Sequence, residues 1–183
     1  MGNSTIQITK SDGLILLFTG NGKGKTSAAM GVLARANGWN MRTGVIQFIK
    51  SSERQYGEAQ TAAQLNIPFQ SMGDGFVFSR KDQTQSMQAA RAAWQKAQEW
   101  ILSNKFDLLI LDEITYLFTY EWLDVNEVIQ WLQKNKPKDL HIVMTGRNAS
   151  EALINYADLV TEMKEIKHPY KEKGIPAQKG VDY

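Results

Sequence analysis

Short runs of apolar residues alternate along the chain with longer stretches in which apolar positions recur every three or four residues. Several of the short runs are continuously apolar, which is typical of parallel strands that are covered on both faces. Six strands are predicted: Leu14–Thr19, Thr43–Ile49, Pro68–Met72, Leu108–Leu111, Leu140–Thr145 and Leu159–Glu162. The alternation of strands and helices favours a doubly wound α/β fold with a mostly parallel sheet.

The periodic stretches between these strands predict helices. They are Thr26–Asn37, Glu58–Leu65, about Asp82–Asn104, a helix after Asp124, and one from Ser150 to Tyr156. Asp82 and Asp124 each stand three residues before a Gln or Glu, which resembles a capping box. Gly38 is expected to end the first helix in a left-handed conformation.

The length of 183 residues corresponds to about one domain. We expect residues 13–183 to form it, residues 1–12 to be a flexible N-terminus, and residues 164–183 to be an irregular segment over the surface or over a ligand. The net charge of +2 argues against a broad nucleic-acid interface. No apolar run is long enough to span a bilayer. The absence of cysteine excludes disulfides and thiol chemistry and fits a cytoplasmic location.

The sequence T-G-N-G-K-G-K-T at Thr19–Thr26 follows a predicted strand and opens a helix, as a phosphate-binding loop does. Glycines let the backbone N–H groups converge on phosphate oxygens, and the helix N-terminus adds positive potential. The first glycine stands one residue later than in the common G-x-x-x-x-G-K-[ST] pattern. The predicted nucleotide-binding residues are Gly20, Asn21, Gly22, Lys23, Gly24, Lys25 and Thr26. The fold is thus expected to be P-loop NTPase-like (RecA-like), with about six strands.

Two carboxylates, Asp112 and Glu113, follow the apolar run Leu108–Leu111. Ligands of open α/β sheets bind at the carboxyl ends of the strands, so both should lie at the phosphate site. Asp112 and the hydroxyl of Thr26 are predicted to hold Mg²⁺, directly or through water. Glu113 is either a further group around the metal or, in an ATPase, the base.

Beyond the loop, the sequence resembles the P-loop ATP:corrinoid adenosyltransferases over about residues 13–183. The shared motifs are G-N-G-K-G-K-T at Gly20–Thr26, V-x-Q-F-I-K at Val45–Lys50, L-D-E-x-T-Y at Leu111–Tyr116, T-G-R at Thr145–Arg147, K-H at Lys167–His168 and G-x-D-Y at Gly180–Tyr183. The resemblance implies that Co(I) of a corrinoid attacks C5′ of ATP, so that the adenosyl group moves to cobalt and triphosphate leaves. It also implies that ATP lies reversed in the loop relative to other P-loop NTPases.

Because Co(I) is itself a strong nucleophile, this reaction requires no protein nucleophile or general base. Lys23, Lys25, Thr26 and Mg²⁺ would neutralise the departing triphosphate. The resemblance also implies an aromatic G-F-x-W segment that displaces the lower cobalt ligand. Here it reads Gly75-Phe76-Val77-Phe78, so Phe78 replaces the tryptophan.

Some assignments stay open at this level. Phe76 and Phe78 are either this wedge or core residues, and Arg147 contacts the nucleotide, the corrinoid or only a surface carboxylate. A flavodoxin-type or flavin reductant is the expected electron donor, and whether the chain forms a homodimer stays open. A kinase or ATPase acting at the γ-phosphate, and a non-catalytic ATP-dependent switch, are the alternative functions.

Overall fold

The computed structural model describes residues 12–51, 56–73, 75 and 84–183. Within these residues six strands form one sheet, in which every pair of neighbours is parallel. The strands are β1 (Ile15–Thr19), β2 (Thr43–Ser51), β3 (Phe69–Gly73), β4 (Leu108–Asp112), β5 (His141–Thr145) and β6 (Leu159–Glu162). Their order across the sheet is β3-β2-β4-β5-β1-β6. The six predicted strands and the parallel α/β fold are therefore confirmed.

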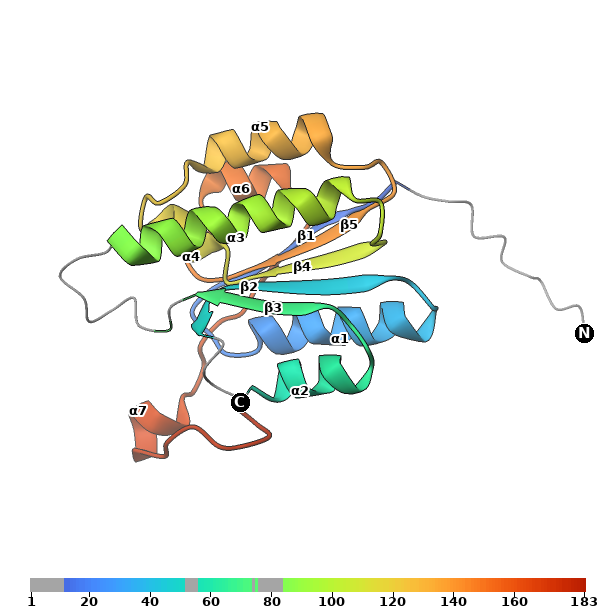
Figure 1. The fold of residues 1–183 in the computed structure, drawn as a ribbon. Helices are drawn as coiled ribbons and strands as arrows, with labels where there is room; N and C mark the ends of the chain where they lie inside the picture. Colours follow the sequence, from blue (N-terminus) through green and yellow to red (C-terminus); the bar gives the residue numbers. More distant parts are fainter. Residues whose placement is uncertain (1–11, 52–55, 74, 76–83) are drawn as a thin grey trace, which may run out of the picture.

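Helices cover both faces of the sheet (Figure 1). They are α1 (Lys25–Gly38), α2 (Gly57–Gln64), α3 (Thr84–Leu102), α4 (Thr115–Thr119), α5 (Val125–Asn135), α6 (Glu151–Tyr156) and α7 (Pro169–Lys173). In Figure 1, α3, α5 and α6 lie above the sheet and α1 and α2 lie below it, whereas α7 projects away from both layers. No helix in the described part of the chain is both long and apolar enough to cross a membrane.

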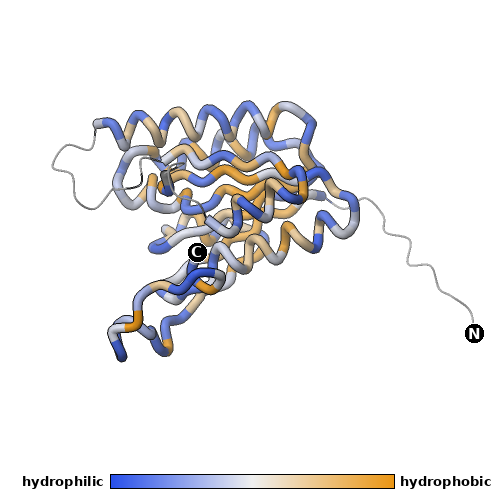
Figure 2. The backbone as a smooth tube through the Cα atoms, turned by 60° about the horizontal axis from the view of Figure 1, so that its bottom comes forward, coloured by the Kyte–Doolittle hydropathy of each residue, from blue (hydrophilic) through white to orange (hydrophobic). Residues whose placement is uncertain are grey.

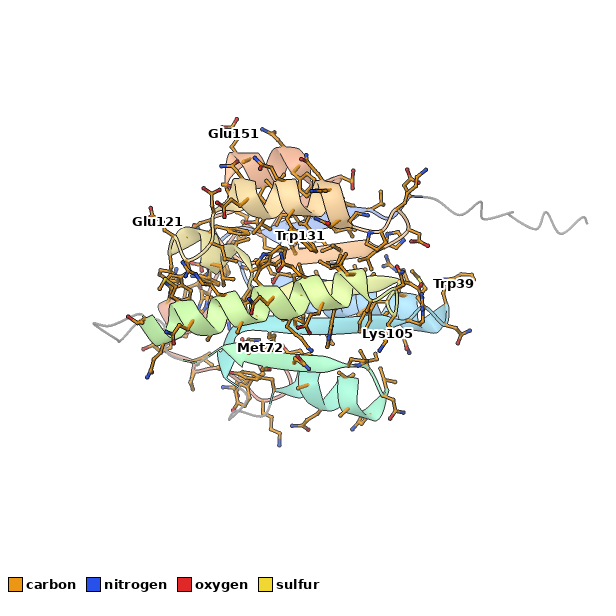
Figure 3. The ribbon with its side chains drawn as sticks, turned by 45° about the horizontal axis from the view of Figure 1, so that its top comes forward. Trp39, Met72, Lys105, Glu121, Trp131 and Glu151 are labelled. Atoms are coloured by element: carbon orange, nitrogen blue, oxygen red, sulfur yellow. The ribbon has the colours of Figure 1, made fainter. Side chains whose placement is uncertain are left out.

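The strands carry apolar side chains to both faces, so the tube in Figure 2 is most hydrophobic along the sheet. Leu109 and Leu111 of β4 belong to the buried cluster beneath α3 and α5, while Leu108 and Ile110 belong to the cluster beneath α1. The rings of Trp94 in α3 and Trp131 in α5 meet edge to face, with their centroids 5.4 Å apart. Figure 3 labels Trp131 between these two helices. This double coverage explains why the strand runs are continuously apolar rather than alternating.

Three details differ from the sequence-based expectations. Gly38 is the last residue of α1, and the left-handed residue is Asn40, with φ of 57°, because asparagine also tolerates this conformation. The irregular segment contains α7, which begins at a proline and ends at left-handed Gly174. The short helix α4 follows β4 and was not predicted. Five-residue helices are too short to show a hydrophobic period.

The parallel arrangement collects all strand ends at one edge of the sheet. The phosphate loop follows β1 and the acidic pair ends β4, with β5 lying between these two strands. The strand ends of β2 and β5 add Lys50 and Arg147 at the same edge, and the end of the chain returns there. Residues 1–11 and Asp82 lie outside the described residues, so the flexible N-terminus and the cap at Asp82 stay predictions.

Candidate functional site

Gly20 and Gly24 of the phosphate loop each require glycine, but for different structural reasons. Gly20 has φ of 92°, and a Cβ there would lie 2.6 Å from the carbonyl oxygen of Met163, which follows β6. Gly24 has φ of 108° with open space around it, so it supplies the left-handed turn that starts α1. The amide of Gly22 donates to the Met163 carbonyl at 2.6 Å. The loop is thus fastened to the chain segment after β6 while its far side stays open.

Lys25 lies folded over the loop that precedes it. Its ammonium donates to the carbonyl oxygens of Gly20 and Gly22, each at 2.7 Å. Burial lowers the pKa of Lys25, and the charge of Arg147 adds to this effect, while Glu113 and Asp112 oppose it. The ammonium therefore already occupies the centre of the loop, where a phosphate chain would meet it.

Asp112 is the centre of a buried hydrogen-bond network and is 0% exposed. Its Oδ1 accepts from the hydroxyls of Thr26 at 2.9 Å and Thr145 at 2.7 Å, and its Oδ2 accepts from Nε2 of Gln47 at 3.0 Å. Gln47 in turn accepts from the hydroxyl of Ser71 at 3.0 Å. The carboxylate therefore ties α1, β2 and β5 together, and it sits behind Thr26 rather than on the surface of the cavity.

Glu113 is turned out of line with the strand by its left-handed backbone, with φ of 65°. Its amide donates to the Thr145 hydroxyl at 2.8 Å, which fixes the turn. Burial raises the pKa of the Glu113 carboxyl to about 7, and the neighbouring Asp112 adds to the rise, while Lys50 and Lys25 oppose it. A carboxyl held in this way readily gives up its proton when a cation arrives.

A cavity of about 180 Å³ lies over the loop. It is lined by Gly22–Ser27, Lys50, Glu58, Glu113, Tyr116, Arg147, Val181 and Asp182. Pockets that hold a whole small-molecule ligand usually measure roughly 300–1,000 Å³. The cavity therefore has room for a phosphate chain, with the rest of a nucleotide extending beyond it. On its outer side Lys23 pairs with Asp182, whose Oδ2 also accepts from the amide of Gln178 at 2.8 Å.

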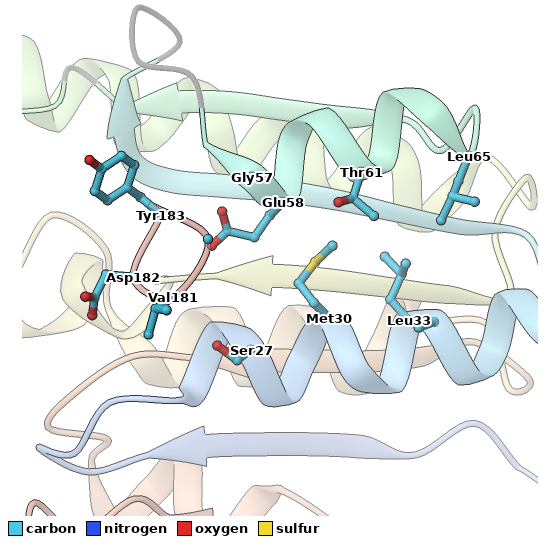
Figure 4. A pocket seen from close by; sticks show the side chains of 12 residues that line it. Ser27, Met30, Leu33, Gly57, Glu58, Thr61, Leu65, Val181, Asp182 and Tyr183 are labelled. Carbon is cyan, nitrogen blue, oxygen red and sulfur yellow. The ribbon is translucent and has the colours of Figure 1, made fainter. Parts of the chain in front are cut away.

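A larger groove of about 440 Å³ adjoins this cavity and shares four of its lining residues: Ser27, Glu58, Val181 and Asp182. Figure 4 shows it between α1, which carries Met30 and Leu33, and α2, which carries Thr61 and is followed by Leu65. Val181–Tyr183 lie at its mouth (Figure 4). The end of the chain therefore borders both hollows.

The structure brings together most of the residues that the sequence singled out. The loop residues, Thr26, Asp112, Glu113 and Arg147 lie at one edge of the sheet, although Asp112 reaches the cavity only through Thr26. Phe76 and Phe78 lie outside the described residues. Gly75, which precedes them, donates to the carbonyl oxygen of Ile49 at 3.1 Å, so the chain leaves the sheet beside the end of β2.

Several residues of the site were not found by sequence reasoning. Gln47, Thr145 and Lys50 each stand inside a shared motif, but their contacts depend on register between strands that are far apart in sequence. Asp182 belongs to the terminal motif G-x-D-Y, but the motif does not indicate that it pairs with Lys23. The only indication in the sequence is that these residues belong to the shared motifs. Which of their side chains face the loop is seen only in the fold.

Oxygen ligands suited to Mg²⁺ are present at the cavity. The Thr26 hydroxyl and the Glu113 carboxyl line it, and both are hard oxygen donors. In the part of the chain that the structure describes, no group of three or more His, Cys, Asp or Glu side chains forms a metal cage.

The chain matches the family described as ATP:corrinoid adenosyltransferase BtuR/CobO/CobP over residues 11–183. A corrinoid adenosyltransferase from Sinorhizobium sp. is 40% identical, with 97% of this chain and 85% of the relative covered. The corrinoid adenosyltransferase of Escherichia coli K12 is 37% identical, with 93% and 86% covered. Corrinoid adenosyltransferase CobA of Salmonella typhimurium LT2 is 36% identical, with 97% and 89% covered.

Among solved structures, the flagellar accessory protein FlaH from Methanocaldococcus jannaschii resembles the fold with a TM-score of 0.57. The two chains share 10% identity, and the match covers 83% of this chain and 71% of that one. At this identity the likeness concerns the architecture alone.

Proposed function

We propose how the site works from the premise that the chain belongs to the ATP:corrinoid adenosyltransferase family. The enzyme transfers the 5′-deoxyadenosyl group of ATP to the Co(I) of a corrinoid and releases triphosphate. On our proposal, the cavity over Gly20–Thr26 holds the triphosphate, and the corrinoid approaches C5′ from outside it. The observation that carries this proposal is the position of Lys25, whose ammonium lies on the loop at the cavity floor.

On our proposal, cobalt supplies the nucleophile and the protein stabilises the leaving group. The cobalt lone pair forms the bond to C5′, the C5′–O bond breaks, and its electron pair stays on the triphosphate, which gains one negative charge. On our proposal, Lys23 and Lys25 stabilise this charge, and Arg147 extends the positive rim of the cavity. No side chain has to accept or donate a proton in this step, so Glu113 is not assigned as a base.

We propose Mg²⁺ as the cofactor, held by Thr26 and Glu113, with Asp112 orienting the Thr26 hydroxyl from behind. When bound, the ion would supply further positive charge to the phosphates. The loss of the raised-pKa proton from Glu113 would accompany its binding. Metal titration in weakly buffered solution should therefore release protons from the wild type and fewer from Glu113→Gln.

We propose that ATP lies reversed in the loop relative to other P-loop NTPases, so that the ribose carbon C5′, and not the γ-phosphate, is presented to the corrinoid. The shifted glycine supports an altered cradle, because Gly20 is pressed against Met163 and sets the path of the loop. This orientation would leave C5′ accessible to cobalt at the open side of the cavity.

We propose that Phe76 and Phe78 displace the lower ligand of the corrinoid and so ease reduction to Co(I). Gly75, at the start of this motif, donates to the carbonyl oxygen of Ile49 in β2, the strand that also brings Lys50 to the cavity. Truncating both to Ala should abolish adenosylation from cob(II)alamin with a mild reductant but spare conversion of pre-formed cob(I)alamin. If both are core residues, the double variant instead loses about 3–5 kcal/mol for each and unfolds.

We further propose a flavodoxin-type or flavin reductant, a homodimer and a cytoplasmic location. A reduced flavin is a chemically suitable electron donor, and the absence of cysteine fits a reducing compartment. Reduction assays with each donor would test the reductant, and native mass measurement would test the homodimer. Fractionation of cells would test the location.

One product analysis tests the function as a whole. ATP is incubated with and without chemically reduced cob(I)alamin, and the phosphates are separated by chromatography. We expect triphosphate and a light-sensitive adenosylated corrinoid only when the corrinoid is present. ADP formed regardless of corrinoid would favour a kinase or ATPase, and tight ATP binding without turnover would favour a switch.

A further inference from the structure

A bulge in β2 turns Lys50 toward the nucleotide cavity. Side chains of a strand alternate between faces, yet Phe48 and Ile49 both pack against the cluster beneath α3. The pairing of β2 with β3 shifts register between Gln47, which pairs with Ser71, and Ser51, which pairs with Gly73, so β2 carries two extra residues there. Without this shift Lys50 would follow Phe48 to the α3 face. Bulges often occur beside active sites, where they re-aim a side chain.

The surroundings keep Lys50 charged while it is largely buried. Its side chain is 19% exposed, and its ammonium lies 3.6 Å from Oε1 of Glu58 and 4.7 Å from the ring centre of Tyr56. Burial alone would lower the pKa of Lys50, but Asp112 and Glu113 outweigh it, and the pKa ends above its usual value. A fixed cation thus stands at the cavity wall formed by β2 and α2, separate from the loop that holds Lys25.

We infer that Lys50 is a further catalytic residue, which contacts the end of the triphosphate that separates from C5′; the inference rests on the proposed function and on reversed ATP. When the C5′–O bond breaks, its electron pair remains on the oxygen of the α-phosphate, so negative charge grows most at that end. A cation placed there gains attraction in the transition state and raises kcat. Lys25 contributes from inside the loop, and Lys50 adds a further cation from the wall formed by β2 and α2.

The test compares Lys50→Met with wild type in single-turnover adenosylation of pre-formed cob(I)alamin at saturating ATP. ATP binding without corrinoid is measured by calorimetry, and melting temperature reports folding. We expect kcat to fall about 10- to 100-fold while the Kd for ATP changes less than about threefold. Lys50→Arg keeps the charge and should recover most of the rate.

A matched control separates the loss of this particular cation from a general loss of positive charge. Lys138→Met removes an equal charge from an exposed pair with Asp12 and should leave both constants unchanged.

The inference is overturned if Lys50→Met keeps the wild-type kcat, if its loss lies wholly in ATP affinity, or if Lys138→Met loses as much activity. It is also overturned if Lys50→Arg folds normally but shows no recovery. Failure of the wild type to release triphosphate would instead contradict the proposed function.

Discussion

The two walls of the nucleotide cavity are built in opposite ways. The inner wall rests on Asp112, which is wholly buried and accepts three side-chain hydrogen bonds from α1, β2 and β5. The outer wall rests on the pair between Lys23 and Asp182, in which the lysine side chain is 50% exposed. One wall is part of the core, and the other is made by the end of the chain.

This difference matters for the reaction because the two walls have different tasks. Buried polar groups are costly unless all partners are present, so the network around Asp112 fixes the Thr26 hydroxyl in one place. Exposed ion pairs contribute little and are easily exchanged for another partner. An incoming phosphate can therefore replace Asp182 at Lys23, whereas it cannot rearrange the inner wall. The following experiments test this division, from the largest expected effect to the smallest.

Removal of the central carboxylate should damage the inner wall most. Asp112→Ala leaves the hydroxyls of Thr26 and Thr145 and the amide of Gln47 without their acceptor in a buried place. We expect a loss of about 3–5 kcal/mol in the free energy of unfolding, measured with urea. Triphosphate release by the remaining folded protein should fall at least about 100-fold. An unchanged free energy of unfolding would show that the hydrogen bonds to Asp112 do not stabilise the fold.

The inner wall should also make stability depend on pH through Glu113. Its pKa is raised from the ordinary 4.5 to about 7, so the folded state binds the proton more tightly than the unfolded chain. The free energy of unfolding therefore falls as pH rises through this window, by up to about 3 kcal/mol from this group. Urea unfolding of wild type and Glu113→Gln in a chelator, at pH 5 and pH 8, isolates the effect. Parallel changes in both proteins would contradict it.

Residues on the cavity floor should affect binding more than folding. Lys25→Ala removes the ammonium that faces the phosphates, and Thr26→Ala removes the hydroxyl bonded to Asp112. A charge-assisted contact is worth about 1.5–3 kcal/mol, so ATP affinity or turnover should fall roughly 10- to 100-fold. Calorimetry and the adenosylation assay measure this, with circular dichroism as the check on folding. Wild-type adenosylation by Lys25→Ala would contradict a role of the loop in holding ATP.

The inner wall was largely predictable from sequence, while the outer wall was not. The glycines, Lys25 and Thr26 are adjacent in the chain, and Asp112 ends an apolar strand, so local pattern and sheet polarity place them together. Gln47 and Lys50 depend on the register of β2 and on its bulge, which no local pattern reports. Asp182 meets Lys23 across 159 positions. Such a contact depends on the path of a segment whose only helix has five residues.

The smallest expected effect on stability and on ATP binding comes from a substitution in the outer wall. Asp182→Asn removes the charge that pairs with Lys23 but keeps a side chain able to accept from the amide of Gln178. Stability should barely change, because the lysine is half exposed and exchanges its partner for water. Lys23 is then released for the triphosphate, so ATP should bind more tightly, by less than about fivefold. Calorimetry at two salt concentrations measures this gain, which should shrink as salt rises. Weaker ATP binding by Asp182→Asn would show that the chain end holds the nucleotide rather than competing with it, and the two walls would then act as one.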